Sequence, residues 1–523
     1  MMSSTARRFT PWLGLVILGV LAVCFYAPYR ERPFDIIDFS EILALLSGGS
    51  GAAGRLARLV RYYGEEHGRF NILSYAGMVM KWQLFGANPL AWQLVRAAQL
   101  LAAMAGTYLL CRRLAAGAWG ATLGAALVLF SFSASHGWVR LTVPEPLGLL
   151  CALGAALLAT RVRGARHWKA IAIGSGVLMA FAILAKEMLV AWMPVVAYLG
   201  CFLGEDGKIE PIRRPELRGR WVTLAVGAGM ALASIPVLYA MRGMKVQGYA
   251  RQFGSGGLSV DRVADIAQRM LLPWPAGIGG EGAAMMLPSL LFIVTIAVGF
   301  LAARGDAEWA PHARRAMVLG LAIPALGTVL YSPWPVYWSS YGIPFVFGPG
   351  LLLAIAVTSA ERATARAGWA ARASALLCVA LVMGPSVHLA NRMAARQEVN
   401  AGLARALLSY RNADSVVVAL VVPPRAATVG IGPAMREYAL IVSPGAVLPP
   451  VIDAQCEDAA ARGRRAGGLG RTVVISYSDQ CGAITGATLT LRRSFGYFDL
   501  SRFGMARDSM RADLFDPMAR SVR

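Results

Sequence analysis

Long apolar segments recur along the chain and alternate with short charged ones. A helix that crosses the hydrocarbon core of a bilayer needs about 20 apolar residues, so each long segment predicts a membrane span. The segment 170–203 would form about 50 Å of helix, more than one crossing, and we expect it to turn back near Lys186 and Glu187. Eleven spans are predicted, at about residues 11–29, 89–110, 119–135, 145–160, two within 170–203, 221–241, 286–303, 316–331, 342–358 and 373–389.

Basic residues occur in clusters in alternate connections between these spans. The positive-inside rule places such clusters in the cytoplasm, together with Arg7 and Arg8 before the first span. Because eleven is odd, the C-terminal segment is then expected outside. A cleavable signal peptide is the alternative for the first span, but no clear A-x-A site follows it, which favours a retained anchor. The clusters are Arg112/Arg113, Arg161/Arg163/Arg166/Lys169, Lys208/Arg213/Arg214/Arg218/Arg220, Arg304/Arg314/Arg315 and Arg362/Arg366/Arg372.

Composition agrees with a polytopic α-helical membrane protein. The 523 residues are 57% hydrophobic and only 15% charged, which is too apolar for a soluble globular chain. The formal net charge of +22 comes from scattered clusters rather than from one continuous stripe. This distribution indicates topology and contact with membrane lipids, and it argues against nucleic acid as a partner.

The C-terminal segment 391–523 is less apolar than the rest. Residues 395–410 have helical spacing, whereas 415–422 and 471–478 are rich in β-branched residues and predict strands. Cys456 and Cys481 are the only cysteines of this segment, and an oxidising compartment could join them. We therefore expect a transmembrane domain at 1–390, with a first outer loop at 30–88, and a small extracytoplasmic α/β domain at 391–523.

Several ionisable and aromatic residues map to the predicted outer face. Ionisable groups at the edge of a bilayer are costly to desolvate and are often functional. No histidine or cysteine pair has metal-ligand spacing, so no metal site is predicted, and two G-x-G-x-x-G matches lie in outer loops away from cytosolic nucleotide. The candidate residues are Asp35, Asp38 and Glu41 after the first span, His136, Arg140 and Glu145, Lys186 and Glu187, Arg242, Lys245 and Arg251, and Trp334, Tyr337, Trp338 and Tyr341.

Four stretches together resemble the GT-C fold of integral membrane glycosyltransferases, which includes protein O-mannosyltransferases and bacterial aminoarabinose transferases. They are IIDFSEIL, GRFNILSYAGMVMKWQLFGANPLAWQLVR, VPEPLG and ILAKEMLVAWMP. The resemblance implies a polyprenyl-phosphate sugar as donor, used on the outer face, and an acidic residue of the first outer loop acting at the acceptor. Asp38 is the nearest match to that residue. Phe39 stands where the family often has Glu, which leaves Asp35 and Glu41 as rivals.

The residue types suit this chemistry. Cations such as Lys186, Arg242 and Lys245 would hold the phosphate leaving group, so no cofactor or metal is required. A carboxylate would take the proton of the attacking hydroxyl, which implies inversion at the sugar carbon. Glu145, Glu187 and the aromatic residues Trp334, Tyr337 and Tyr341 would contact the substrate.

Each assignment has a structural alternative. Asp38 and Glu41 also fit a D-x-x-E capping box. Lys186 and Glu187 also fit a tight helical turn, the aromatic residues an interfacial belt, and the basic residues lipid contacts.

The expected function is an inverting hexosyl- or pentosyltransferase of a bacterial inner membrane. It would move a sugar from a lipid-linked donor to a lipid, glycan or protein. A transporter or flippase, and a polymerase or ligase of lipid-linked saccharides, are the alternatives. A transporter would be expected to show repeated halves or broken helices, and the sequence shows neither.

Overall fold

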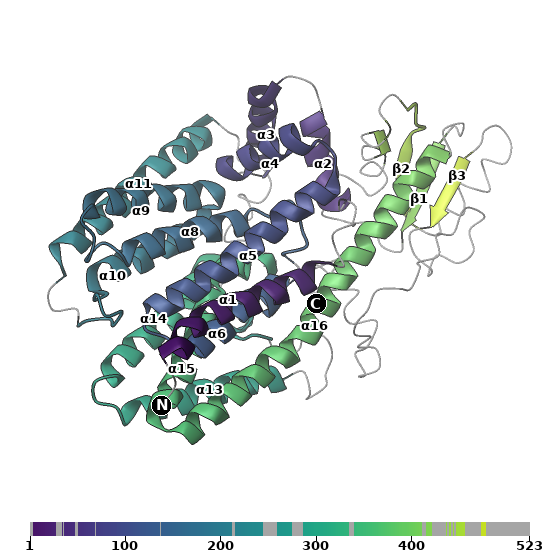
Figure 1. Cartoon of the computed structure of the whole chain (residues 1–523). Helices are drawn as coiled ribbons and strands as arrows, with labels where there is room; N and C mark the ends of the chain where they lie inside the picture. Colours follow the sequence, from purple (N-terminus) through teal and green to yellow (C-terminus); the bar gives the residue numbers. More distant parts are fainter. Residues whose placement is uncertain are drawn as a thin grey trace.

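A computed structural model gives the fold of the chain. It describes residues 4–27, 34, 36–47, 51–67, 69–135, 137–211, 215–243, 259–274, 286–333, 339–409, 415–420, 436, 439–440, 443, 446–455 and 472–476. The described part is mostly helical, with a bundle of apolar helices, a layer of three shorter helices at one end of it, and a small sheet beyond (Figure 1).

The bundle is built from helices that coincide with the predicted spans. Its members are α1 (Ser4–Tyr26), α5 (Pro89–Arg113), α6 (Ala118–Phe130), α8 (Glu145–Ala159), α9 (Trp168–Ala185), α10 (Met193–Phe202), α11 (Leu217–Gly243), α13 (Leu287–Arg304), α14 (Ala310–Tyr331), α15 (Phe347–Ala363) and α16 (Ala365–Ser409). By length and composition, five of the described helices can cross a membrane: Pro89–Arg113, Trp168–Ala185, Leu287–Arg304, Ala310–Tyr331 and Ala365–Val387. Every predicted span therefore contains a helix, whereas the number of crossings stays a prediction.

Local sequence explains several helix boundaries. Asn88 accepts hydrogen bonds from the backbone N–H groups of Leu90 and Ala91, and Pro89 occupies the first turn, so α5 begins there. The predicted turn inside 170–203 is confirmed: α9 ends at Ala185, and the 3₁₀ helix η2 (Glu187–Trp192) leads into α10.

One predicted boundary is wrong. The tenth span was expected from residue 342, but Pro344 lies in a 3₁₀ helix, η5 (Ser339–Phe345), and α15 starts at Phe347. The apolar part of α16 that can cross a membrane ends at Val387, close to the predicted end of the last span near residue 389. The helix itself continues to Ser409 in spite of Pro385, so the helix predicted at 395–410 is the continuation of the last span rather than a separate element.

Close helix contacts hold the bundle together. A Cβ on Gly350 of α15 would lie 2.6 Å from the carbonyl oxygen of Gly124 in α6, so both helices need glycine at their crossing. The connections at one end of the bundle include the 3₁₀ helices η2 and η5 and the turn before α8. The opposite end contains the loops after α5 and α10 and the start of α14.

A second hydrophobic cluster lies outside the bundle. It is formed by α2 (Ile36–Ser47), α3 (Gly51–His67) and α4 (Ile72–Phe85), which lie together at the top of Figure 1. Leu43 and Leu46 of α2 pack there with Tyr75 and Met78 of α4. Leu407, near the end of α16, and Val451 complete the cluster, so the first and last parts of the chain meet here.

The C-terminal segment contains a parallel sheet of three described strands. β1 (Ser415–Leu420) lies between β2 (Val451–Gln455) and β3 (Thr472–Ser476). The two predicted strands correspond to β1 and β3. Most of 391–523 beyond α16 and this sheet, including Cys456 and Cys481, lies outside the described residues, so the full extent of an α/β domain stays a prediction.

Candidate functional site

A buried ion pair joins the start of α8 to the end of α9. Lys186 Nζ lies 3.4 Å from Glu145 Oε1, and both side chains are only 1% exposed. The same ammonium lies 3.7 Å from Oε1 of Glu187, whose side chain is 34% exposed. Burying these charges costs free energy that their mutual attraction only partly returns, so such a group is weak support for stability and is often retained for function.

Tyr341 of η5 adds an aromatic ring to this group. Lys186 Nζ lies 4.9 Å from the centroid of the Tyr341 ring, a cation–π distance. The ring stacks on Tyr331, at the end of α14, with 5.0 Å between centroids and 10° between planes. Stacking on Tyr331 thus fixes the orientation of the Tyr341 ring beside the buried ammonium of Lys186.

Arg69, between α3 and α4, brings a second cation to Tyr341. Its Nη2 donates a hydrogen bond of 2.8 Å to the Tyr341 hydroxyl. Burial alone would lower the pKa of Arg69, but Tyr341, Glu187 and Glu145 together raise that pKa above its ordinary value. The guanidinium therefore stays charged beside the ion pair.

Arg69, Glu145 and Tyr341 border a cavity of about 220 Å³, which we call the acidic–basic cavity. It lies between α3, α4, the start of α8 and η5, and it combines two arginines, one glutamate and three tyrosines. Its lining residues are Tyr63, Arg69, Asn71, Ser74, Tyr75, Met78, Arg140, Thr142, Val143, Pro144, Glu145, Ser340 and Tyr341.

Arg96 of α5 is a positioning residue that the sequence analysis missed. It is 3% exposed, and its Nη2 donates to the carbonyl oxygens of Leu141, at 2.9 Å, and Val143, at 3.0 Å. These bonds hold the turn that leads into Glu145. An arginine inside an apolar span is a recognisable signal, because such a charge is expensive unless it has a partner.

The predicted catalytic carboxylates belong to α2 or precede it. Asp38 and Glu41 lie within α2, but their side chains, like all of Asp35, lie outside the described residues. One prediction is wrong: Asp38 was expected to open this helix as its cap, whereas α2 begins at Ile36 and Asp38 is its third residue. The apolar residues Ile36 and Ile37 take helical conformation first, and so Asp38 lies in the first turn rather than before it.

The remaining predicted residues divide into two groups. Lys186, Glu187, Glu145 and Tyr341 lie together, and Arg140 lines the acidic–basic cavity beside them. Arg242 lies in α11, where its side chain is not described, and Lys245, Trp334 and Tyr337 lie outside the described residues, together with His136, Arg251 and Trp338.

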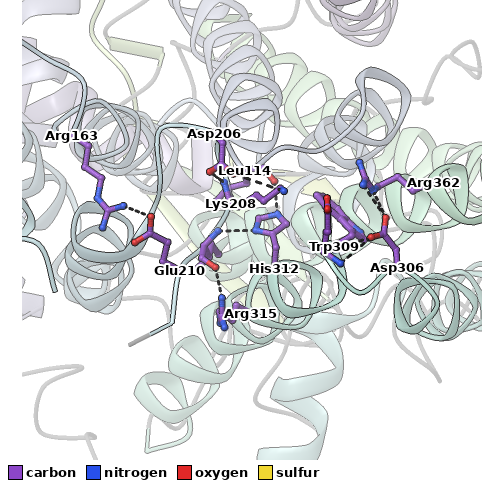
Figure 2. Close-up of polar contacts among 12 residues, drawn as sticks. Leu114, Arg163, Asp206, Lys208, Glu210, Asp306, Trp309, His312, Arg315 and Arg362 are labelled. Atoms are coloured by element: carbon purple, nitrogen blue, oxygen red, sulfur yellow. Dashed lines mark hydrogen bonds and ion pairs between the residues drawn. The ribbon is translucent and has the colours of Figure 1, made fainter. Parts of the chain in front are cut away.

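A larger cavity, of about 510 Å³, lies at the opposite end of the bundle. Its central residue is His312 of α14, which Figure 2 shows between two backbone groups. His312 Nδ1 accepts a 2.8 Å hydrogen bond from the Ile209 N–H, so the neutral ring carries its proton on Nε2 and donates it to the Leu114 carbonyl oxygen at 3.0 Å. Arg315 donates to the Ile209 carbonyl oxygen at 2.5 Å. His312 and Arg315 thus clamp the loop after α10.

Several charges around this larger cavity pair with one another. Arg163 contacts Glu210 at 2.7 Å, and Lys208 lies 3.9 Å from Asp206 (Figure 2). Arg163 also lies 2.9 Å from Glu216. Arg163 Nε, at the larger cavity, makes no hydrogen bond of good geometry, but it lies in the ion pair with Glu216. In the acidic–basic cavity, Asn71 Oδ1 and Glu145 Oε2 are buried without a hydrogen-bond partner in the part of the chain that the structure describes. Burying polar atoms without hydrogen bonds is costly, and a bound ligand would supply the missing hydrogen bonds. The smaller cavity is therefore the better candidate for a ligand site.

Comparisons with known proteins give structural likenesses only. No protein-family model matches the chain. No curated protein matches it either. Among solved structures, ArnT from Cupriavidus metallidurans bound to undecaprenyl phosphate is 14% identical, with a TM-score of 0.45 over 92% of this chain and 96% of that chain. The arabinofuranosyltransferase AftD from Mycobacteria is 16% identical, with a TM-score of 0.46 over 84% of this chain and 32% of that one.

The oligosaccharyltransferase of Archaeoglobus fulgidus in its apo form is 11% identical, with a TM-score of 0.45 over 86% of this chain and 65% of that chain. All three are membrane glycosyltransferases of the GT-C fold. This is the family that the sequence motifs resemble. Likenesses at these values carry no residue roles from one chain to another.

Proposed function

We propose that the protein is a membrane glycosyltransferase that moves a sugar from a polyprenyl-phosphate donor to a hydroxyl of a lipid, glycan or protein acceptor. The observation that carries this proposal is the acidic–basic cavity, which Arg69, Arg140 and Glu145 line, with the buried Lys186 paired to Glu145. About 220 Å³ is less than the roughly 300–1,000 Å³ of a site for a drug-sized ligand, so a headgroup fits and a prenyl chain stays outside.

The cations suit a lipid-phosphate leaving group. Guanidinium groups bind phosphate oxygens through paired N–H donors, and Arg69 and Arg140 are placed to do so. Lys186 adds positive charge from behind Glu145 and Tyr341. In our proposal the bond between sugar carbon C1 and the phosphate oxygen breaks, and these cations stabilise the negative charge that collects on the phosphate. Arg242 and Lys245 remain proposed as further contacts, and the reaction is proposed to need no cofactor or metal.

A carboxylate is required at the acceptor. In our proposal Asp38 takes the proton of the acceptor hydroxyl. The oxygen of that hydroxyl bonds to C1 of the sugar from the face opposite the phosphate, which inverts the configuration at C1. The position of α2 supports this role, because α2 shares its hydrophobic cluster with Tyr75, which lines the cavity. Asp35 and Glu41 are the rivals for the role. Glu187 and Glu145, with the aromatic residues, would contact the substrate.

The distribution of basic residues supports a site on the outer face. The end of the bundle that holds His312, opposite the acidic–basic cavity, carries basic residues in its connections and in the adjoining helix ends: Arg112, Arg163, Lys208, Arg315 and Arg362. If the positive-inside rule applies to these connections, the cavity faces away from the cytoplasm. We therefore propose a multi-pass protein of a bacterial inner membrane with a cytoplasmic N-terminus and an extracytoplasmic C-terminal segment.

Purified protein in proteoliposomes tests the function directly. Undecaprenyl phosphate carrying radiolabelled glucose, galactose, mannose or arabinose is supplied as donor, with a membrane extract from a strain lacking the chain as the source of acceptor. We expect label to move to an acceptor with one donor, and free undecaprenyl phosphate to appear in equal amount. The proposal is wrong if no donor is consumed and the deletion strain has unaltered envelope lipids, glycans and glycoproteins.

A further inference from the structure

Three buried polar groups line the acidic–basic cavity without a hydrogen-bond partner among the described residues. They are Asn71 Oδ1, Tyr75 Oη and Glu145 Oε2. Their residues are 4%, 3% and 1% exposed. Burying a polar atom without a hydrogen bond lowers the stability of the fold by about 1–3 kcal/mol. Three such atoms on one cavity therefore indicate that another molecule forms hydrogen bonds with them.

Asn71 is informative because of its place in the chain. It is the N-cap residue of α4, where an asparagine side chain normally accepts a hydrogen bond from the first turn of the helix. Here no such bond forms, although Asn88 makes it at the start of α5. The Asn71 oxygen is therefore available to the cavity rather than to its own helix.

The chemistry of the three groups defines what they bind. Asn71 Oδ1 and Glu145 Oε2 only accept hydrogen bonds, while the Tyr75 hydroxyl both donates and accepts. A ligand that satisfies them must carry several donors within one small volume. The Tyr75 ring also stacks on Tyr63, with 5.0 Å between centroids and 14° between planes, so a flat aromatic wall adjoins the polar atoms. Hydroxyl groups around a compact ring match this pattern.

We infer that Asn71, Tyr75 and Glu145 form a subsite for the hydroxyl groups of a sugar, separate from the arginines that face the phosphate. The inference rests on the proposed function and adds the residues that select the sugar. Asn71 and Glu145 accept hydrogen bonds from sugar hydroxyls, and Tyr75 donates one in return. The cations Arg69 and Arg140 are left to the phosphate.

Binding measurements separate the two halves of the ligand. The dissociation constant of the full-length protein is measured for bare undecaprenyl phosphate and for undecaprenyl phosphate carrying glucose, galactose, mannose or arabinose. The ratio of the two constants is the contribution of the sugar. Tyr75→Phe and Asn71→Leu each remove one polar group at nearly constant volume, and Asn71→Leu removes no helix cap. Tyr198→Phe, half-buried in α10 and outside both cavities, is the matched control.

We expect each cavity variant to reduce the sugar's contribution about three- to tenfold and to leave the affinity for bare undecaprenyl phosphate unchanged, with no effect of Tyr198→Phe. A series of donors that each lack one hydroxyl sharpens the test. The donor that lacks the hydroxyl bound by the substituted residue should bind wild type and variant equally, because that hydrogen bond is absent from both complexes.

The possible failures are distinguishable. If wild-type protein binds sugar-bearing lipids more tightly than the bare lipid but the variants keep that ratio, the three groups are satisfied by water and the subsite is wrong. A variant that weakens both lipids equally also overturns the subsite. If folded wild-type protein binds none of the sugar-bearing lipids, the proposed function itself fails and the subsite with it.

Discussion

Lys186 Nζ and Glu145 Oε1 lie 3.4 Å apart in a place that solvent does not reach. The two residues come from the end of one helix and the start of another, 41 positions apart in the chain. Each is therefore the main compensation for burying the other, and a substitution of either has two effects, one on stability and one on chemistry.

Lys186→Met should separate these effects when combined with Glu145→Gln. The single substitution leaves a buried carboxylate unpaired, which typically costs about 3–5 kcal/mol, so both protein level and sugar transfer should fall. Adding Glu145→Gln removes that unpaired charge and should restore the protein level and thermal stability in detergent. Transfer should stay low, because the phosphate lacks the charge of Lys186 and the sugar lacks the carboxylate of Glu145. Normal transfer by the double variant would mean that the pair is only structural.

Arg69→Met should weaken donor binding. A hydrogen bond to a charged group contributes about 1.5–3 kcal/mol, so the affinity for undecaprenyl phosphate should fall about tenfold or more. The control is Arg61→Met, which removes an exposed arginine of α3 that pairs with Glu65 four residues later. Such exposed pairs contribute little. Equal affinities of the two variants would place the phosphate away from Arg69.

Asp38→Asn tests the proposed base. Asn keeps the shape of the side chain within the first turn of α2 but cannot take a proton, and loss of a general base lowers the rate by about two to four orders of magnitude. The protein should accumulate normally in the membrane, because the two residues differ by only tenths of a kcal/mol near a helix start. Asp35→Asn should be milder. Near-normal transfer by Asp38→Asn, with a dead Asp35→Asn or Glu41→Gln, would assign the base to that neighbour.

Membrane orientation is tested by a reporter fused after Arg523 that is active only in the cytoplasm. We expect it to be inactive, and a reporter active only outside to work, because the basic connections lie at the end of the bundle opposite the cavity. A fusion after Lys208, in the loop held by His312, should give the reverse result. Cytoplasmic activity of the C-terminal fusion would remove the basis for placing the cavity on the outer face.

His312→Ala should destabilise the bundle without touching the acidic–basic cavity. It leaves the Ile209 N–H and the Leu114 carbonyl without their shared partner, which is worth about 2–4 kcal/mol for two buried groups. The melting temperature in detergent should fall, while the affinity for undecaprenyl phosphate in the cold should match the wild type. Lys208→Ala, in the same loop but more exposed, is the control. An unchanged melting temperature would show that the loop is not held by this histidine.

The sequence predicted the bundle well because helices that cross a membrane depend on length and apolarity, which can be counted. The turn at Lys186 follows from such a count: one bilayer cannot hold the mostly apolar segment 170–203, which has 34 residues, as a single helix. The same count does not predict η5, which contains Pro344 and delays the start of α15 to Phe347. It also does not show that α16 continues beyond its apolar part to Ser409.

The site was predicted only in part, because contacts between residues far apart in the sequence bring its side chains together. Arg69 and Tyr341 are 272 positions apart, and nothing in the stretch around Arg69 indicates that a tyrosine will meet it. Asn71 resembles an ordinary helix cap in sequence, and its unused oxygen appears only in three dimensions. Arg96 is the exception, since its charge in an apolar segment was visible from the start.

The hydrophobic cluster shared by α2, α4 and α16 has a consequence for folding during synthesis. Chains are made from the N-terminus, and domains generally fold as their parts emerge. Leu43 and Leu46 are synthesised early, yet Leu407 and Val451, which pack in the same cluster, arrive hundreds of residues later. The apolar side of α2, the helix that carries Asp38, therefore stays incompletely covered until the end of α16 has been synthesised. A chain that terminates before the end of α16 would contain the preceding helices of the bundle but would lack the residues that complete the packing of α2.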